Sequence, residues 1–192
     1  MQELSRRTFL AGVGGSIATA WFAVEARDLF AAAAHAAIAG AQQPRAAFQV
    51  LTPDQAADID AFTAQIIPTD ETPGAREAHA VYFVDRALAT FAGDFRPKFE
   101  KGWADLRARS KRLGRGAKSF VALTSAQQIA VITAMEKDKS EFFQAMRWAT
   151  IAGMLANPEY GGNSNKLGWK MIGFDDRFSW ASPFGWYDRD VR

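Results

Sequence analysis

Between residues 52 and 156, apolar residues recur at helical spacing in five segments that polar turns separate. The first segment starts at Thr52, a residue type typical of helix N-caps, and continues with Pro53 at the first helical position. Pro68 ends it, because proline removes a backbone donor and its ring clashes with the preceding turn. The pattern predicts a helix over about 53–67 that buries one face, formed by Ala56, Ile59, Phe62, Ile66 and Ile67.

Four more helices are predicted by the same criteria. One ends before the break at Gly93 and Asp94, and the next spans about 96–113. The other two start at the N-cap residues Thr124 and Ser140, and the last ends near Ala156 because a proline follows. No segment shows the sustained alternation of a β-strand. The predicted fold class is therefore all-α, with about five helices and a long structured C-terminal region rich in glycine and aromatic residues.

The N-terminus has a different pattern, in which an arginine pair precedes an uncharged apolar stretch over 8–24. This pattern is typical of a twin-arginine export signal, which directs proteins that have already folded out of the cytoplasm. We expect export to the periplasm. The expected signal residues are Ser5, Arg6, Arg7, Phe9 and Leu10.

The sequence allows more than one position for the end of this leader. The uncharged stretch is at the short limit for spanning a bilayer and contains several glycines, which favours a signal over a lasting anchor. Small-residue cleavage patterns occur at 34–36 and 39–41, but region 9–40 could instead remain as a helix that packs against a partner. With a leader of 1–41, residues 42–192 form one helical domain.

Composition excludes several kinds of site. There is no cysteine, which excludes disulfides, iron–sulfur clusters, thiolate zinc sites and a c-type haem attachment. The only histidines are His35 and His79, so a His-rich metal site cannot form. The net charge of +2 is too small to indicate a nucleic-acid partner. Since no glycine-rich nucleotide motif follows a strand either, we predict no catalytic, cofactor or metal site in this chain.

Charged clusters allow two interpretations each. The acidic pairs at 70–71 and 175–176 could bind a cation or act as acid and base, but acids in turns mostly cap or face solvent. Asp85 could pair with charges on its own helix, or cap the glycine-rich C-terminal turn. A basic cluster is either a solvated helix end or a docking surface for an acidic partner or lipid headgroups; it comprises Arg107, Arg109, Lys111, Arg112, Arg115 and Lys118.

Two motifs in the C-terminal region combine turn residues with aromatic anchors. Proline fixes φ, glycine permits positive φ, and asparagine can bond nearby backbone or adopt a left-handed conformation. The motif residues are Pro158, Tyr160, Gly161, Gly162 and Asn163, then Gly168, Trp169, Lys170 and Gly173. Beyond them, the last fifteen residues either fold back on the domain or lie on a partner, and their aromatics are Phe178, Trp180, Phe184, Trp186 and Tyr187.

Together these motifs resemble the gluconate 2-dehydrogenase subunit 3 family. The segments 66–75 and 84–86 look like two of its motifs, and 158–163 with 168–173 look like its C-terminal signature. The twin-arginine leader fits as well, whereas Asn157 stands where the family often has aspartate. In the first two segments the residues that carry the resemblance are Pro68, Asp70, Pro73, Gly74, Asp85 and Arg86.

The resemblance implies a small, non-catalytic subunit of a periplasmic dehydrogenase complex, and such a complex would associate the protein with the inner membrane. Its large subunit would be an FAD-dependent oxidoreductase of the glucose-methanol-choline type that oxidises a sugar, glycoside or polyol, and a multihaem cytochrome c often accepts the electrons. The small subunit would supply the signal for the twin-arginine translocase and help the large subunit mature. We expect the partner interface at the motif residues and at Trp180, Trp186 and Tyr187. The alternative is a free-standing exported enzyme or binding protein that uses residues near His79 and the acidic turns.

Overall fold

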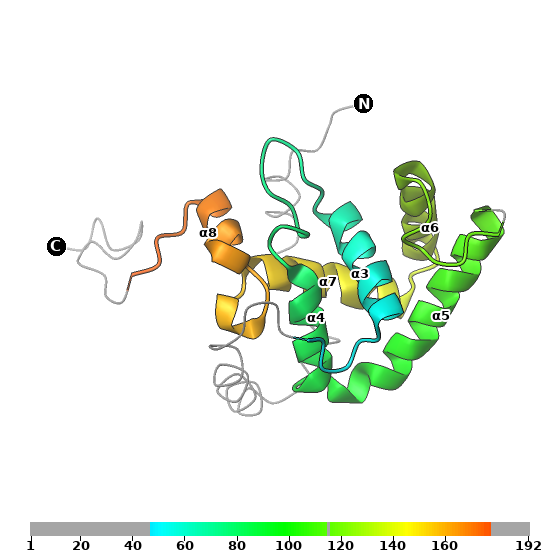
Figure 1. Ribbon diagram of the computed structural model, residues 1–192, viewed down its shortest axis with the longest axis horizontal. Coiled ribbons are helices and arrows are strands. Elements are labelled where there is room, and N and C mark those ends of the chain that lie inside the picture. The colour runs from blue at the N-terminus through cyan, green and yellow to red at the C-terminus, as the bar shows by residue number, and fades with distance from the viewer. Residues whose placement is uncertain (1–46, 115, 178–192) are drawn as a thin grey trace.

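The structure is a computed structural model that describes residues 47–114 and 116–177. These residues form helices and turns without a β-strand (Figure 1), which confirms the predicted all-α class. None of the described helices is long and apolar enough to cross a membrane. The elements are α3 (Pro53–Ile66), α4 (Ala80–Ala89), η2 (Gly93–Phe95), α5 (Arg96–Leu113), α6 (Ser125–Lys137), α7 (Glu141–Leu155), η3 (Pro158–Tyr160), η4 (Ser164–Lys166) and α8 (Leu167–Ile172), where η marks a 3-10 helix.

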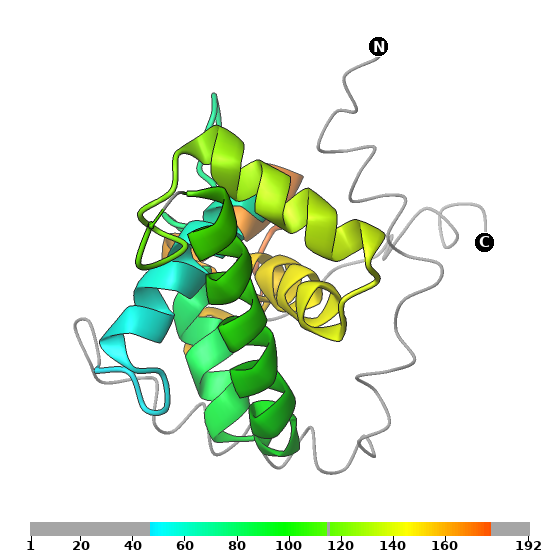
Figure 2. The ribbon, with the colours of Figure 1, turned by 90° about the vertical axis from the view of Figure 1, so that its right-hand side faces the viewer.

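Helix α7 lies at the centre and contacts α3, α4, α5, α6 and α8 (Figures 1 and 2). Its buried face presents aromatic side chains at its start and small residues at its end. Phe142 meets Phe62 of α3 edge to face, with ring centroids 5.9 Å apart. At the other end Gly153 lets α4 approach, because a Cβ atom there would lie only 3.0 Å from the Cβ of Phe83. The apolar core therefore extends along the whole of α7.

Local sequence explains how these helices begin. Thr52 and Thr124 each accept a hydrogen bond from the backbone N–H three residues later, and a glutamine side chain completes a capping box at both sites. The Ser140 hydroxyl accepts the N–H of Phe143 at the start of α7, without a capping box. These three N-caps and the predicted range 96–113 for α5 are confirmed.

The C-terminal region contains a helix that the sequence pattern did not predict. The six residues of α8 are too few to show helical periodicity, and an isolated helix of this length would not be stable in water. Its position depends instead on close backbone contact with the end of α7. A Cβ atom at Gly168 would lie 1.8 Å from the carbonyl oxygen of Met154, and one at Gly162 would lie 2.1 Å from that of Gly153.

Gly162 does not use the positive φ that glycine permits. Among the described motif glycines, only Gly161 and Gly173 adopt positive φ, at 100° and 71°. Gly162 is required because its backbone touches α7, where any side chain would collide. Asn163 does adopt the left-handed conformation expected of it, with φ of 48°.

We predict that Gly168→Ala lowers the free energy of unfolding by about 2–3 kcal/mol or detaches α8 from α7, because the new methyl group overlaps a carbonyl oxygen. Urea unfolding, followed by the fluorescence of the neighbouring Trp169, measures both effects. Gly93→Ala is the control, since a Cβ atom there meets nothing closer than 3.9 Å. Equal stability of the two variants would contradict the backbone contact.

Candidate functional site

The motifs singled out in the sequence meet around α4 and the end of α7. Segment 66–75 and the residues before α4 form a small apolar cluster with Met154 of α7, against which Met171 of α8 also packs. The backbone N–H of Ser164 donates to the carbonyl oxygen of Ala78 across 3.0 Å. The structure therefore brings together three stretches, the farthest of which, at Ile67 and Met171, are about a hundred residues apart in sequence.

Asp85 anchors the segment that leads into α3. Its side chain is 1% exposed and accepts three backbone hydrogen bonds, from Gln49 at 2.8 Å and from Val50 and Leu51 at 2.9 Å each. The interpretation that Asp85 caps the glycine-rich C-terminal turn was therefore wrong. Its partners could not be identified from local sequence, because they precede it by more than thirty residues.

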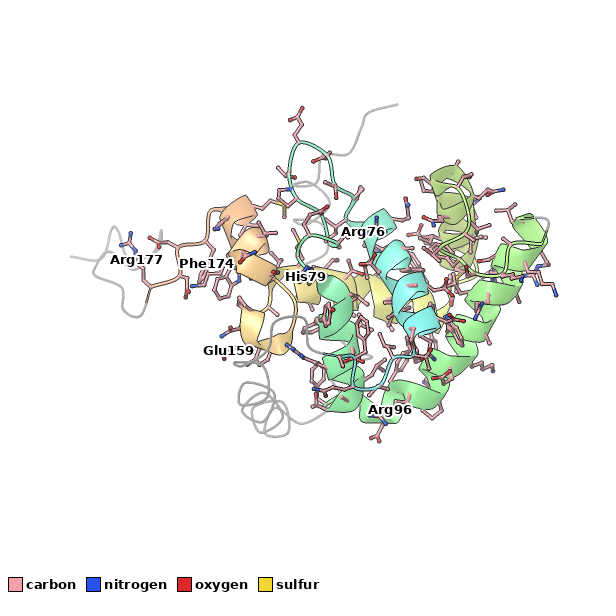
Figure 3. The ribbon with its side chains drawn as sticks, in the orientation of Figure 1. Arg76, His79, Arg96, Glu159, Phe174 and Arg177 are labelled. Carbon is pink, nitrogen blue, oxygen red and sulfur yellow. The ribbon has the colours of Figure 1, made fainter. Side chains whose placement is uncertain are left out.

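It is the neighbouring Arg86 that faces the C-terminal turn. Its guanidinium Nη1 donates to the carbonyl oxygen of Glu159 at 3.5 Å, a long hydrogen bond. Gly161 passes so close that a Cβ atom there would lie 2.7 Å from this nitrogen and 3.0 Å from the carbonyl oxygen of Tyr82. Figure 3 shows Glu159 on this turn, beside α4 and below α8.

Asn163 joins the end of α7 to the start of α8. Its side chain is fully buried, its Nδ2 donates to the carbonyl oxygen of Ala156, and its Oδ1 accepts from the N–H of Gly168, both at 2.8 Å. The indole Nε1 of Trp169 donates to the carbonyl oxygen of Leu155 at 2.7 Å. Carbonyl groups at a helix C-terminus lack partners within the helix, and these side chains supply them.

The motif around Pro68 and Pro73 forms a tight polar turn. The Oδ1 of Asp70 accepts the N–H of Thr72 at 2.9 Å, as in an Asx-turn. The Oε2 of Glu77 accepts the hydroxyl of Thr69 at 2.7 Å and the N–H of Gly74 at 2.8 Å. These bonds, with that from Thr69 the stronger influence, hold the pKa of Glu77 below its ordinary value. The predicted Asp70 thus has a structural role in this turn.

His79 and the acidic pair at 175–176 lie apart from the turn at 68–77. His79 occupies the N-cap position of α4 with φ of 57°, and its ring lies 5.7 Å from that of Tyr82 (Figure 3). Asp176 pairs with Lys166 at 2.5 Å, and Asp175 pairs with Arg177. Among residues 47–114 and 116–177, no group of three or more histidine, aspartate and glutamate side chains is placed to hold a metal ion.

Sequence reasoning missed a second buried carboxylate, that of Asp58. Its Oδ2 accepts the indole N–H of Trp103, and its Oδ1 accepts the backbone N–H of Val121, both at 3.0 Å. The guanidinium of Arg107 lies 3.8 Å from the same carboxylate and 5.0 Å from the centre of the Trp103 ring. The sequence did offer one indication of this role. Asp58 stands next to Ile59, a residue of the apolar face predicted for this helix.

The basic cluster is partly neutralised within the domain. Arg109 bonds Asp138 and Asp105, and these two carboxylates raise its pKa. Lys111 and Lys118 are exposed and line an open cavity of about 350 Å³ beside Arg107. Arg115 lies outside the described residues, as do the signal residues Ser5, Arg6, Arg7, Phe9 and Leu10, the 41/42 boundary and the aromatic Trp180, Trp186 and Tyr187.

We predict that Asp85→Asn lowers the free energy of unfolding by about 2–4 kcal/mol, because both carboxylate oxygens accept backbone N–H groups and the substitution turns one of them into an NH₂ group that faces an N–H donor. Asp60→Asn is the control, since its pair with Arg76 is partly exposed and such pairs contribute at most about 1 kcal/mol. Urea unfolding measures both. A similar loss in the two variants would contradict the anchoring role of Asp85.

Acid should weaken the turn that Glu77 closes. A folded-state pKa below the unfolded one means that this carboxylate stabilises the fold at higher pH, and that its contribution disappears as pH falls through the folded pKa. We therefore expect Glu77→Gln to be less stable than the parent at pH 7 and equally stable well below pH ~4. Thermal unfolding across this range measures the difference, with Glu71→Gln as control. A difference that persists in acid would contradict the role assigned to the Glu77 carboxylate.

Comparison with known proteins shows which family this chain is related to. Residues 53–176 match the model of the family described as gluconate 2-dehydrogenase subunit 3. No curated protein and no solved structure matches the chain. The matched region covers more than half of the 192 residues and includes every helix described above. The chain therefore belongs to the gluconate 2-dehydrogenase subunit 3 family.

Proposed function

We propose that this chain is the non-catalytic small subunit of an exported FAD-dependent dehydrogenase. Its catalytic partner is a flavoprotein of the glucose-methanol-choline type that oxidises a sugar, glycoside or polyol. The observation that carries this proposal is the family match over 53–176, since the family consists of subunits of a dehydrogenase complex.

The use of polar side chains in the domain supports a non-catalytic role. The two most buried carboxylates, Asp58 and Asp85, accept backbone and indole N–H groups of their own chain. The amide of Asn163 is likewise occupied by backbone groups on both sides. Groups held in this way stabilise a scaffold, whereas an acid or base in catalysis must be able to reach a substrate.

The N-terminal sequence supports a role in export. Arg6 and Arg7 precede an uncharged stretch, and the twin-arginine translocase moves folded proteins. The domain begins soon after this leader, where the Asp85 carboxylate holds the backbone of Gln49. A flavoprotein without its own signal could thus leave the cytoplasm bound to this folded domain, which would also stabilise it during maturation.

The test is purification of a tagged full-length chain from the periplasm of cells that also encode the partner. We expect a flavoprotein in the same fractions, recognised by flavin absorbance and by peptide masses of a glucose-methanol-choline dehydrogenase. Replacing Arg6 and Arg7 by lysine should lower the periplasmic amount of both proteins at least tenfold, because the translocase requires the arginine pair. Arg27→Lys is the control, since it lies beyond the apolar stretch.

One result would overturn the whole proposal, and another would overturn its export part. A colourless, soluble monomer would point to the alternative of a free-standing exported protein, and a search for a substrate near His79 would follow. Periplasmic flavoprotein that persists after the double arginine substitution would exclude the export role while leaving the subunit role in place.

A further inference from the structure

We propose that the end of α5 binds the surface of a membrane that contains anionic lipids. We call this surface the basic end and define it by the cations Lys111, Arg112 and Lys118 and by the exposed apolar residues Leu113 and Val121 beside them. The inference goes beyond the proposed function and does not depend on it. Of the two interpretations of the basic cluster, it favours a docking surface over a solvated helix end.

The first argument is that the three cations of the basic end have no acidic partner. The acidic side chains near this end of α5 pair instead with Arg107 and Arg109, and they are Asp54, Asp58, Asp105 and Asp138. The side chains of Lys111, Arg112 and Lys118 make no ion pair within residues 47–114 and 116–177. Cations at a helix C-terminus offset the helix dipole, but Lys118 lies beyond the helix. The excess of positive charge therefore attracts anions from outside the domain.

The second argument is that two of these cations border one open cavity of about 350 Å³, which Lys111 and Lys118 line together with Gly116. The loop beyond α5 is tied to the helix here, because the Nη2 of Arg107 donates to the carbonyl oxygen of Lys118 at 2.5 Å. Gly116 leaves the cavity open, since even a Cβ atom there would meet nothing within 4 Å. The cavity thus has room for an anionic group such as a phosphate.

The third argument is that exposed apolar side chains accompany the charges. Leu113 is 43% exposed and stands two residues after Lys111, and Val121 is 45% exposed and stands three residues after Lys118. Proteins that bind at a lipid interface combine cations, which meet the headgroups, with apolar side chains that enter the boundary with the acyl chains. Cations that only face solvent would not need these apolar neighbours.

The chain's own remaining segments do not supply the anion. Residues 178–192 contain two aspartates and two arginines, and residues 1–46 contain one more basic than acidic residue. A second copy of this chain is also unsuitable, because its net charge is +2. The occupant that complements the basic end is therefore a different, anionic surface.

Two observations favour a membrane over an acidic protein surface. The guanidinium beside the cavity, that of Arg107, already donates to Asp54 and to the carbonyl oxygen of Lys118, so it does not present an open pair of donors to a carboxylate. The ammonium groups of the two lysines act as point charges, which suit phosphate. Moreover, α8 and its glycine motifs, where we expect the catalytic subunit, lie at the opposite end of the domain from the end of α5 (Figure 1).

The main test is cosedimentation of the protein, purified from the periplasm as above, with vesicles of phosphatidylglycerol and phosphatidylcholine at about 100 mM salt. We expect the combined change Lys111→Gln and Lys118→Gln to weaken binding about 25-fold, because each cation near an anionic surface contributes roughly fivefold. Both side chains are exposed and unpaired, so the variant should unfold at the parent's temperature.

The matched control is Lys98→Gln combined with Lys101→Gln, which removes the same charge from the first half of α5. Lys98 pairs only with the exposed Glu141, and Lys101 precedes Lys111 by ten residues, or about 15 Å along the helix. Binding should stay at the parent's level in this control. Any contribution of residues 1–46 to vesicle binding is common to the parent and both variants.

A second measurement locates the contact directly. Because the chain contains no cysteine, a single Leu113→Cys or Ile172→Cys substitution can be labelled with a polarity-sensitive fluorophore. Ile172 is a control, since it is 49% exposed on α8 at the other end of the domain. We expect phosphatidylglycerol vesicles to shift the emission to shorter wavelength at position 113 and to leave it unchanged at position 172.

Four results would overturn the inference. The first is equal binding of the parent and the Lys111 and Lys118 variant, and the second is equal binding to vesicles of phosphatidylcholine alone. The third is release by inorganic phosphate that exceeds release by sodium chloride of equal ionic strength, which would indicate a site for a free anion. The fourth is loss of flavoprotein with unchanged vesicle binding in this variant, which would indicate an acidic protein surface. Vesicle binding can be measured whether or not a flavoprotein copurifies, so its failure is distinct from failure of the proposed function.

Discussion

The arrangement of this domain depends on backbone contact at the last turn of α7. On one side Gly153 lets α4 approach, and on the other the backbones of Gly162 and Gly168 touch the same turn. The carbonyl oxygens that a helix end leaves without partners are reached here by the N–H of Asn163, at 2.7 Å from Gly153, and by the indole of Trp169. A side chain at any of these glycines would push the neighbouring element away from α7, so these positions are glycine for steric reasons.

Two buried carboxylates fix loops that the helices alone would leave unattached. Asp85 of α4 holds the segment before α3, and Asp58 of α3 holds the loop before α6 at Val121. Both accept backbone N–H groups, which avoids leaving a charge or a donor buried without a partner. The described side chains contain no buried nitrogen or oxygen atom without a hydrogen-bond partner. The polar interior is therefore a set of attachments between helices and loops.

Local features were predictable from sequence, and contacts between distant segments were not. Thr52, Thr124 and Ser140 act within three residues of themselves, so their capping roles follow from the sequence around them. Asp85 binds residues more than thirty positions away, and Gly162 touches the last turn of a neighbouring helix, so the roles of both depend on how the elements pack. Helix α8 was missed for the same reason, because what forms it is its contact with α7.

The anchoring of residues 49–51 also has a mechanical consequence. A pull on the N-terminal end of the described chain reaches the three hydrogen bonds to Asp85 before it reaches the first turn of α3. The stacking of Phe48 on Tyr82, with ring centroids 4.7 Å apart, directs the force to α4 as well. Force applied at residues 48–51 is transmitted to α4, and through α4 to α7 at the centre of the core. The force therefore does not act first on α3. Traction at this end of the described chain would thus be resisted by the domain as a whole.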